Sequence, residues 1–182
     1  PLVPEMRAAG YAFTARGRPR RSRPAEREGT LRQFLRMLGA VPPDSVLVLA
    51  AHDDGAAHFG ELSAVWLRAR RVRGAVIDGA TRDAALLRRL RFPTFVRYRS
   101  PRDSVPRWRV TDWARPVQIG GVRVSLGDVV VADLDGVVIV PRRVAAEVLE
   151  RCERLVGTES RVRRAIRRGV TPLEAYERFG RF

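Results

Sequence analysis

Two short motifs, Gly60-Glu61-Leu62-Ser63 and Arg82-Asp83, carry residue types that could bind a carboxylate and a metal ion together. Each motif begins a predicted helix, and the two helices flank one buried strand. Because ligands bind at strand ends in α/β sheets, we expect both motifs to face one crevice. The free N–H groups of the first helix and the guanidinium of Arg82 can bind carboxylate oxygens. Asp83 offers a hard oxygen ligand for Mg²⁺, and Glu61 can orient metal-bound water.

Each of these residues also has a purely structural interpretation. Asp83 is a good N-cap for the helix that follows it, and Glu61 is a favourable first-turn charge against the helix dipole. Arg82 could be one more surface arginine in a chain that has many. The spacing alone therefore leaves open both a catalytic site and two ordinary helix starts.

Other polar residues give weaker signals. His58 could reach the same crevice or could be a hydrogen-bonding loop histidine, which is the commoner role. The run His52-Asp53-Asp54 is interpreted as a solvated turn rather than a metal cluster. Arg102-Asp103 repeats the Arg-Asp pair, but no apolar helix pattern follows it. We therefore place none of these residues in the predicted site.

The elements that must position the two motifs follow from apolar periodicity. Strands are predicted over residues 11–16, 46–51 and 75–78, and helices from Thr30, over 61–71 and from about Asp83. Residues 17–29 and 52–60 are predicted loops, and Gly79 a turn. This alternation of strands and helices predicts a βαβ layer.

The second half of the chain consists of short apolar runs separated by turn signals. Strands are predicted over 94–98, 107–110, 116–119, 122–126, 128–133 and 137–141, and helices over 142–156, over 158–168 and from Thr171. Gly120-Gly121 and Asp135-Gly136 predict hairpin turns. The sum is a single α/β domain over 1–182 with a mixed sheet, a short irregular segment over 1–29 and C-terminal helices over 142–182.

Every positively charged Lys or Arg position in the chain is an arginine. The net charge is +15, and lysine is absent. The arginines are scattered rather than gathered in one patch, although the densest group is Arg16, Arg18, Arg20, Arg21 and Arg23. We therefore favour compositional drift over a nucleic-acid surface. Without lysine the chain can form no Schiff base, so carbonyl chemistry needs a metal or an oxyanion hole.

The composition also bounds the compartment. Cys152 is the only cysteine, so no intramolecular disulfide is possible, and its helical pattern predicts a buried side chain. No apolar run is long enough to cross a bilayer, and no signal peptide is apparent. We expect a soluble cytoplasmic protein.

The motifs and their flanks resemble a family of metal-dependent pyruvate aldolases and decarboxylases that also contains the RraA-type regulators of ribonuclease E. That family has an acidic residue, twenty intervening residues and then Arg-Asp, a register that Glu61 and Arg82-Asp83 match. The flanking sequences HFGELSA, RGAVIDGATRD and PVQIGGVRVSLGDVVVADLDGVVIVP are similar as well. The resemblance covers roughly Val46 to the C-terminus.

The resemblance implies a layered β/β/α, swivelling-domain-like fold, assembled as a ring-shaped homotrimer or a hexamer with sites at subunit interfaces. It implies a class II, divalent-metal-dependent lyase that cleaves 4-hydroxy-2-oxo acids, such as 4-hydroxy-4-methyl-2-oxoglutarate, to pyruvate. Decarboxylation of oxaloacetate through the same metal-stabilised pyruvate enolate is also implied. Neither a membrane nor a nucleic acid is an expected partner.

The resemblance also assigns roles to residues. Asp83 would ligate Mg²⁺ or Mn²⁺, and Glu61 would orient metal-bound water. Arg82 and the backbone amides of Gly60, Glu61, Leu62 and Ser63 would hold the pyruvoyl carboxylate. Glu159 is a candidate for a carboxylate supplied across the subunit interface. The chain departs from the family in having Glu61 in place of aspartate, Pro106 in place of glycine, and a short N-terminal segment.

Two alternatives to the enzyme stay open at the level of sequence. The first is a non-catalytic regulatory or binding protein, like the family members that inhibit ribonuclease E. Those regulators lack the aspartate of the Arg-Asp pair, and this chain has Asp83. The second is an arginine-rich RNA-binding protein, which predicts a localised basic face and a steep fall of affinity with salt.

Overall fold

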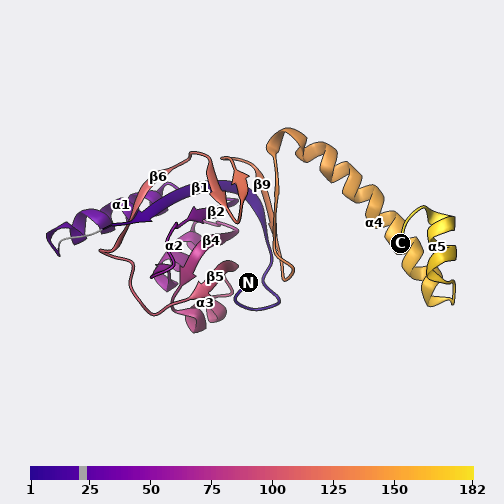
Figure 1. Ribbon diagram of the computed structural model, residues 1–182, viewed down its shortest axis with the longest axis horizontal. Helices are drawn as coiled ribbons and strands as arrows, with labels where there is room; N and C mark the ends of the chain where they lie inside the picture. The colour runs from indigo at the N-terminus through magenta and orange to yellow at the C-terminus, as the bar shows by residue number, and fades with distance from the viewer. Residues whose placement is uncertain (21–23) are drawn as a thin grey trace. The chain divides into compact units, whose positions relative to one another are not determined.

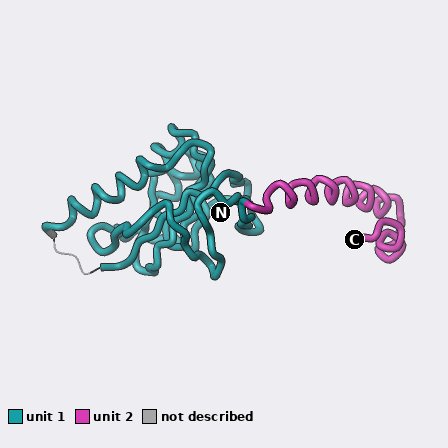
Figure 2. The backbone as a smooth tube through the Cα atoms, turned by 90° about the horizontal axis from the view of Figure 1, so that it is seen from above, with its two compact units in different colours: residues 1–142 teal, residues 143–182 magenta. Residues whose placement is uncertain are grey.

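The protein consists of two compact units, residues 1–142 and residues 143–182 (Figure 2). A computed structural model describes residues 1–20 and 24–182. The first unit holds a mixed sheet and three helices, and the second holds a helical pair. In the described part of the chain, no helix is both long and apolar enough to cross a membrane.

The sheet of the first unit is built around one long strand, β1 (Ala8–Pro19). One edge of β1 pairs in parallel with β2 (Ser45–Ala50). Its other edge pairs antiparallel with β9 (Val129–Ala132) at one end and with β6 (Trp108–Trp113) at the other. A strand that serves three partners fixes the relative positions of distant parts of the chain (Figure 1).

The parallel half of the sheet carries the candidate site. Beyond β2 lies β4 (Gly74–Thr81), which pairs in parallel with β3 (Ala57–Phe59) and with β5 (Thr94–Arg99). Every residue of β2 is buried, as expected for a continuous apolar run in the middle of a parallel sheet.

Three helices complete the first unit. The bounds are Arg27–Gly39 for α1, Glu61–Ala69 for α2 and Ala84–Leu90 for α3. Helices α2 and α3 contact each other. Helix α2 directly follows β3 in the chain, and α3 follows β4. Helix α1 contacts β6. The positions of these helices place the start of α2, the start of α3 and α1 around one cavity, described below.

The remaining strands form hairpins at the turns that the sequence predicts. β7 (Val117–Ile119) and β8 (Val122–Val124) pair antiparallel across Gly120-Gly121. β9 pairs antiparallel with β10 (Val137–Val140) across Asp135-Gly136. The predicted α/β class with a mixed sheet is confirmed.

The second unit differs from its prediction. A single helix, α4 (Ala145–Arg167), replaces the two predicted helices and runs through Gly157 without a break. It follows a 3-10 turn over Arg142–Val144. The predicted capped helix is α5 (Pro172–Phe179), in which Thr171 and Glu174 form a capping box. Cys152 is exposed, so its predicted burial is wrong.

Several boundaries in the first unit also need correction. β1 extends to Pro19, and a 3-10 turn over Pro24–Glu26 leads into α1, where a loop over 17–29 was predicted. Thr30 does not begin the helix. Its buried hydroxyl instead donates to the Glu26 carbonyl one turn back. Gly79 lies inside β4 rather than in a turn. Arg21 and Arg23 of the arginine group lie outside the described residues.

The pairing of β1 with β6 brings Gly17 into close contact with Trp108. The Trp108 ring is buried, and its indole N–H donates to the Ala51 carbonyl at 2.7 Å. A Cβ on Gly17 would lie 2.0 Å from Cζ2 of that ring and 2.5 Å from the carbonyl oxygen of Arg109. The backbone of β1 therefore occupies space that any side chain at this position would need.

Gly17→Ala should lower the free energy of unfolding by about 2 kcal/mol or more, because the new methyl group overpacks a rigid contact. Urea denaturation measures this change. Gly29→Ala is the matched control, since a Cβ there meets nothing within 4 Å. Gly29 lies in the first turn of α1, where that substitution should change the free energy of unfolding by less than about 1 kcal/mol, in the stabilising direction. Equal effects of the two substitutions would contradict the packing described here.

Candidate active site

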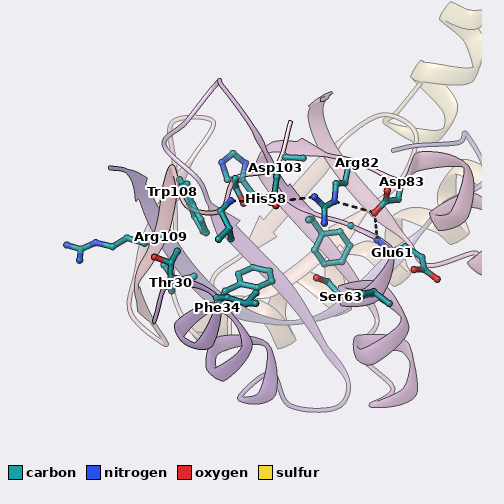
Figure 3. Close-up of a pocket in the computed structure, with 18 of the residues that line it drawn as sticks. Thr30, Phe34, His58, Glu61, Ser63, Arg82, Asp83, Asp103, Trp108 and Arg109 are labelled. Carbon is teal, nitrogen blue, oxygen red and sulfur yellow. Dashed lines mark hydrogen bonds and ion pairs between the residues drawn. The ribbon is translucent and has the colours of Figure 1, made fainter. Parts of the chain in front are cut away.

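A cavity of about 390 Å³ opens between the start of α2, the start of α3, the loop before β6 and helix α1 (Figure 3). It is lined by every residue in which the sequence predicts a site: Gly60, Glu61, Leu62, Ser63, Arg82 and Asp83. The two predicted motifs therefore meet in one place. The roles assigned to the individual residues stay predictions.

The pairing of β3 with β4 brings the motifs together. Phe59, the last residue of β3, is in register with Thr81, the last residue of β4. The N–H of Arg82 donates to the Phe59 carbonyl at 3.0 Å, and the buried Thr81 hydroxyl donates to the same oxygen at 3.0 Å. Because both strands end at this point, Gly60 and Arg82 leave the sheet side by side.

The carboxylate of Asp83 lies at the N-terminus of α2. Its Oδ2 accepts a hydrogen bond from the backbone N–H of Glu61 at 3.2 Å. Asp83 stands at the N-cap position of α3 with φ 58° and ψ 32°, in the left-handed region, and its side chain makes no cap bond to α3. Asp83 therefore caps the neighbouring helix instead of its own, contrary to the structural interpretation from sequence.

Only glycine fits at position 60, because the side chains of Asp83 and Arg82 lie against its Cα. A Cβ on Gly60 would lie 2.7 Å from Oδ2 of Asp83 and 3.3 Å from Nε of Arg82. The missing side chain lets both polar groups approach the first turn of α2. The N–H groups of Leu62 and Ser63 have no acceptor within an α-helix, so they stay available to an anion in the cavity.

The guanidinium of Arg82 lies between two carboxylates. Its Nε is 3.5 Å from Oδ2 of Asp83, and its Nη1 is 3.4 Å from Oδ1 of Asp103. The side chain is 44% exposed, and no acceptor among the described residues contacts its Nη2. Arg82 is thus fixed at two atoms and keeps donors for a third anion.

Asp103 is the residue that the sequence interpretation missed. It was set aside because no helix follows it, yet it lines the cavity and contacts Arg82. Asp103 reaches this position through an isolated parallel bridge to Ala57 in β3. The only sequence signal for it was the Arg102-Asp103 pair, and a bridge between non-adjacent backbone segments has no sequence signature.

The other predicted residues contribute less direct contacts. The carboxylate of Glu61 points away from Arg82, and among the described residues it makes no hydrogen bond or ion pair (Figure 3). Leu62 is 79% exposed. Pro106 follows Val105, which lines the cavity.

The donors at this site fit a hard cation held mainly by water. Asp83 is partly exposed, and its Oδ1 has no hydrogen-bond partner in the described part of the chain. Residues 1–20 and 24–182 contain no group of three or more His, Cys, Asp or Glu side chains that could enclose a metal. The carboxylate of Asp83, in an open cavity that Glu61 also lines, matches Mg²⁺, which binds one or two carboxylates and keeps several waters.

His58 lies under the cavity and is held by its neighbours. Its ring is buried, lies 4.9 Å from the Trp108 ring in an edge-on arrangement, and contacts Oδ2 of Asp53 through Nε2 at 2.9 Å. Its Nδ1 has no hydrogen-bond partner among the residues that the structure describes. Burial lowers the pKa of His58, and the hydrogen bond to Asp53 opposes that effect without overcoming it. The His52-Asp53-Asp54 turn is therefore partly buried through Asp53.

A family model described as RraA-like, Aldolase/RraA, matches residues 1–139. Its match begins well before Val46, where the sequence resemblance was first apparent. A Halalkalibacterium halodurans protein named "Putative 4-hydroxy-4-methyl-2-oxoglutarate aldolase" is 29% identical over 140 residues, which are 77% of this chain and 66% of that protein. An uncharacterized Methanocaldococcus jannaschii protein is 32% identical over 111 residues, 61% of this chain and 53% of that protein. The chain thus spans about one half to two thirds of the length of these relatives.

Solved structures share the fold. An uncharacterized Pseudomonas syringae protein has a TM-score of 0.87 and 29% identity over 98% of this chain and 79% of its own. A Streptomyces coelicolor protein, described as an unusual member of the RNase ES inhibitor RraA family, has a TM-score of 0.79 and 29% identity. That match covers 89% of this chain and 79% of the Streptomyces chain.

The lowered pKa of His58 makes a prediction about stability. Above its unperturbed pKa of about 6.5, His58 is neutral in both states. As the pH falls through that value, His58 binds a proton in the unfolded chain but stays largely neutral in the folded protein. The free energy of unfolding therefore decreases. The urea midpoint of the wild type should therefore fall more between about pH 7.5 and 5.5 than that of His58→Gln.

His52→Gln is the matched control, because His52 is exposed. This control should keep the full pH dependence of the wild type. The same pH dependence in His58→Gln as in the wild type would contradict the role of burial.

Proposed function

The chain belongs to the RraA-like family, and on that premise we propose that it is a divalent-metal-dependent lyase that forms pyruvate from 4-hydroxy-2-oxo acids. The observation that carries the proposal is the pairing of Asp83 with Arg82 at the N-terminus of α2 inside one cavity. This arrangement offers a metal ligand and a carboxylate-binding guanidinium within reach of the same small molecule. The aldolase name of the Halalkalibacterium relative supports the same reaction class.

Arg82 and the first turn of α2 would bind the C1 carboxylate of the substrate. The free Nη2 of Arg82 and the N–H groups of Leu62 and Ser63 are donors that face the cavity. A carboxylate held at these donors has its adjacent 2-oxo group close to Asp83. Asp83 would hold Mg²⁺ or Mn²⁺, which when bound would supply Lewis-acid polarisation of that 2-oxo group.

The reaction then requires two proton movements. The 4-hydroxyl loses a proton as the C3–C4 bond breaks, and the bonding electrons remain on C3 of the pyruvate enolate. That carbon then takes up a proton. Glu61 would orient the water that exchanges these protons, after a rotation of its carboxylate toward the cavity. Decarboxylation of oxaloacetate leaves the same enolate, with carbon dioxide as the leaving group.

A non-catalytic regulatory role is the second candidate. The observation that favours it is the similarity to the Streptomyces protein described within the RNase ES inhibitor RraA family. Asp83 favours the enzyme, because the ribonuclease E regulators that the sequence resembles lack the aspartate of the Arg-Asp pair, and this chain has it. The assembly proposed with either function is a homotrimer or a hexamer. In such an assembly, Glu159 of a neighbouring copy could approach the cavity.

The decisive assay is pyruvate release from 4-hydroxy-4-methyl-2-oxoglutarate and from oxaloacetate, with Mg²⁺ and with EDTA. Activity should appear only with the metal. Asp83→Asn should lower it by more than about 100-fold, since loss of a direct ligand should exceed the 10- to 100-fold effect of an outer partner. Arg82→Ala should weaken the binding of oxalate, a pyruvate-enolate analogue, by about 10-fold or more.

Two exposed residues outside the cavity supply matched controls. Asp135→Asn changes an aspartate in the β9–β10 turn, and Arg88→Ala changes an arginine in the last turn of α3. Both should keep wild-type activity. Failure to release pyruvate from either substrate with Mg²⁺ or Mn²⁺ would overturn the lyase proposal.

A further inference from the structure

Asp103 contacts two guanidiniums at once. Its Oδ1 lies 3.4 Å from Nη1 of Arg82, and its Oδ2 lies 3.7 Å from Nη2 of Arg27. Arg27 is the first residue of α1 and lines the cavity together with Arg82. Two of the arginines that line the cavity are thus joined through a single carboxylate.

Asp103 is itself held in place from both its side chain and its backbone. Its Oδ1 also accepts a hydrogen bond from the N–H of Val105 at 3.2 Å. Its backbone forms the bridge to Ala57, and the N–H of Ala57 donates to the Arg102 carbonyl at 2.8 Å. A carboxylate anchored in this way sets the separation of the two arginines that it contacts.

That separation suits a short dicarboxylic acid. The two nitrogens lie 3.4 Å and 3.7 Å from the two oxygens of the same carboxylate, so they are no more than about 10 Å apart. Arg27 is 61% exposed, and within residues 1–20 and 24–182 only its Nη2 has an ion-pair partner. The same cavity is also lined by Leu31 and Phe34 of α1, apolar side chains suited to contact with a carbon chain.

We propose that Arg27 binds the distal carboxylate of a dianionic oxo acid whose C1 carboxylate is bound by Arg82. Arg27 is then a specificity-determining residue that favours dianionic over monoanionic substrates. This inference rests on the proposed function, because it assumes that Arg82 binds the C1 carboxylate. It adds a residue from α1, an element in which the sequence predicts no site residue.

The inference is tested by binding of two non-cleavable probes in the presence of Mg²⁺, with isothermal titration calorimetry as the readout. 2-Oxoglutarate is the dianion and pyruvate the monoanion. Arg27→Gln should weaken the binding of 2-oxoglutarate by about 10-fold, the effect of losing one charged hydrogen-bonded contact, and change that of pyruvate by less than about 2-fold. Arg27→Lys keeps the charge and should restore most of the preference for the dianion.

Arg32→Gln is the matched control. Arg32 lies on α1, pairs with Glu28 one turn away and does not line the cavity, so its substitution should change neither affinity. Arg82→Ala should weaken both probes. If Arg27→Gln weakened the binding of both probes equally, or of neither, the proposed role of Arg27 would be overturned and the proposed function would stand. Binding of both probes that is insensitive to Arg82→Ala, or no binding by the wild type, would overturn the proposed function instead.

Discussion

The hydrogen bond from the Glu61 N–H to the Asp83 carboxylate joins two residues that are 22 positions apart in the chain, and the rest of the cavity is arranged around it. It forms only because β3 and β4 end in register, at Phe59 and Thr81. It also requires the left-handed backbone of Asp83 and the missing side chain of Gly60. A helix N-terminus attracts a carboxylate through its free N–H groups and dipole, so the structure supplies an electrostatic reason for this unusual backbone conformation.

The parts of this arrangement that sequence could predict are those encoded locally. Continuous apolar runs predict β2 and β4, and the motifs at their ends predict where Gly60 and Arg82 lie. What sequence could not predict depends on contacts between distant segments. Asp103 enters the cavity through a bridge to β3, and Asp83 caps a helix that precedes it in the chain. Thr30 has the composition of a helix start, yet α1 begins a turn earlier and buries that hydroxyl against Glu26.

The arginines of the chain differ in what their surroundings indicate about function. Several arginines pair with acidic neighbours on exposed surfaces, as Arg151 does with Glu147 and Arg73 with Asp44. Exposed pairs of this kind contribute roughly 0–1 kcal/mol each and indicate little about function. Arg82 is different, because it lies between two carboxylates and borders a cavity that also reaches Arg27. The position of a charge relative to other charges therefore says more than the net charge of +15.

The three partners of β1 have a consequence for the order in which the first unit folds. β1 ends at Pro19, yet its antiparallel neighbours begin at Trp108 and Val129. Such pairings close long loops, whose entropy must be lost before the contacts form, and high contact order slows folding. During synthesis, one edge of β1 can pair with β2 early, whereas its other edge has no strand to pair with until about a hundred further residues have been made. The strand that later organises the sheet thus keeps one edge unpaired while most of the first unit is still being synthesised.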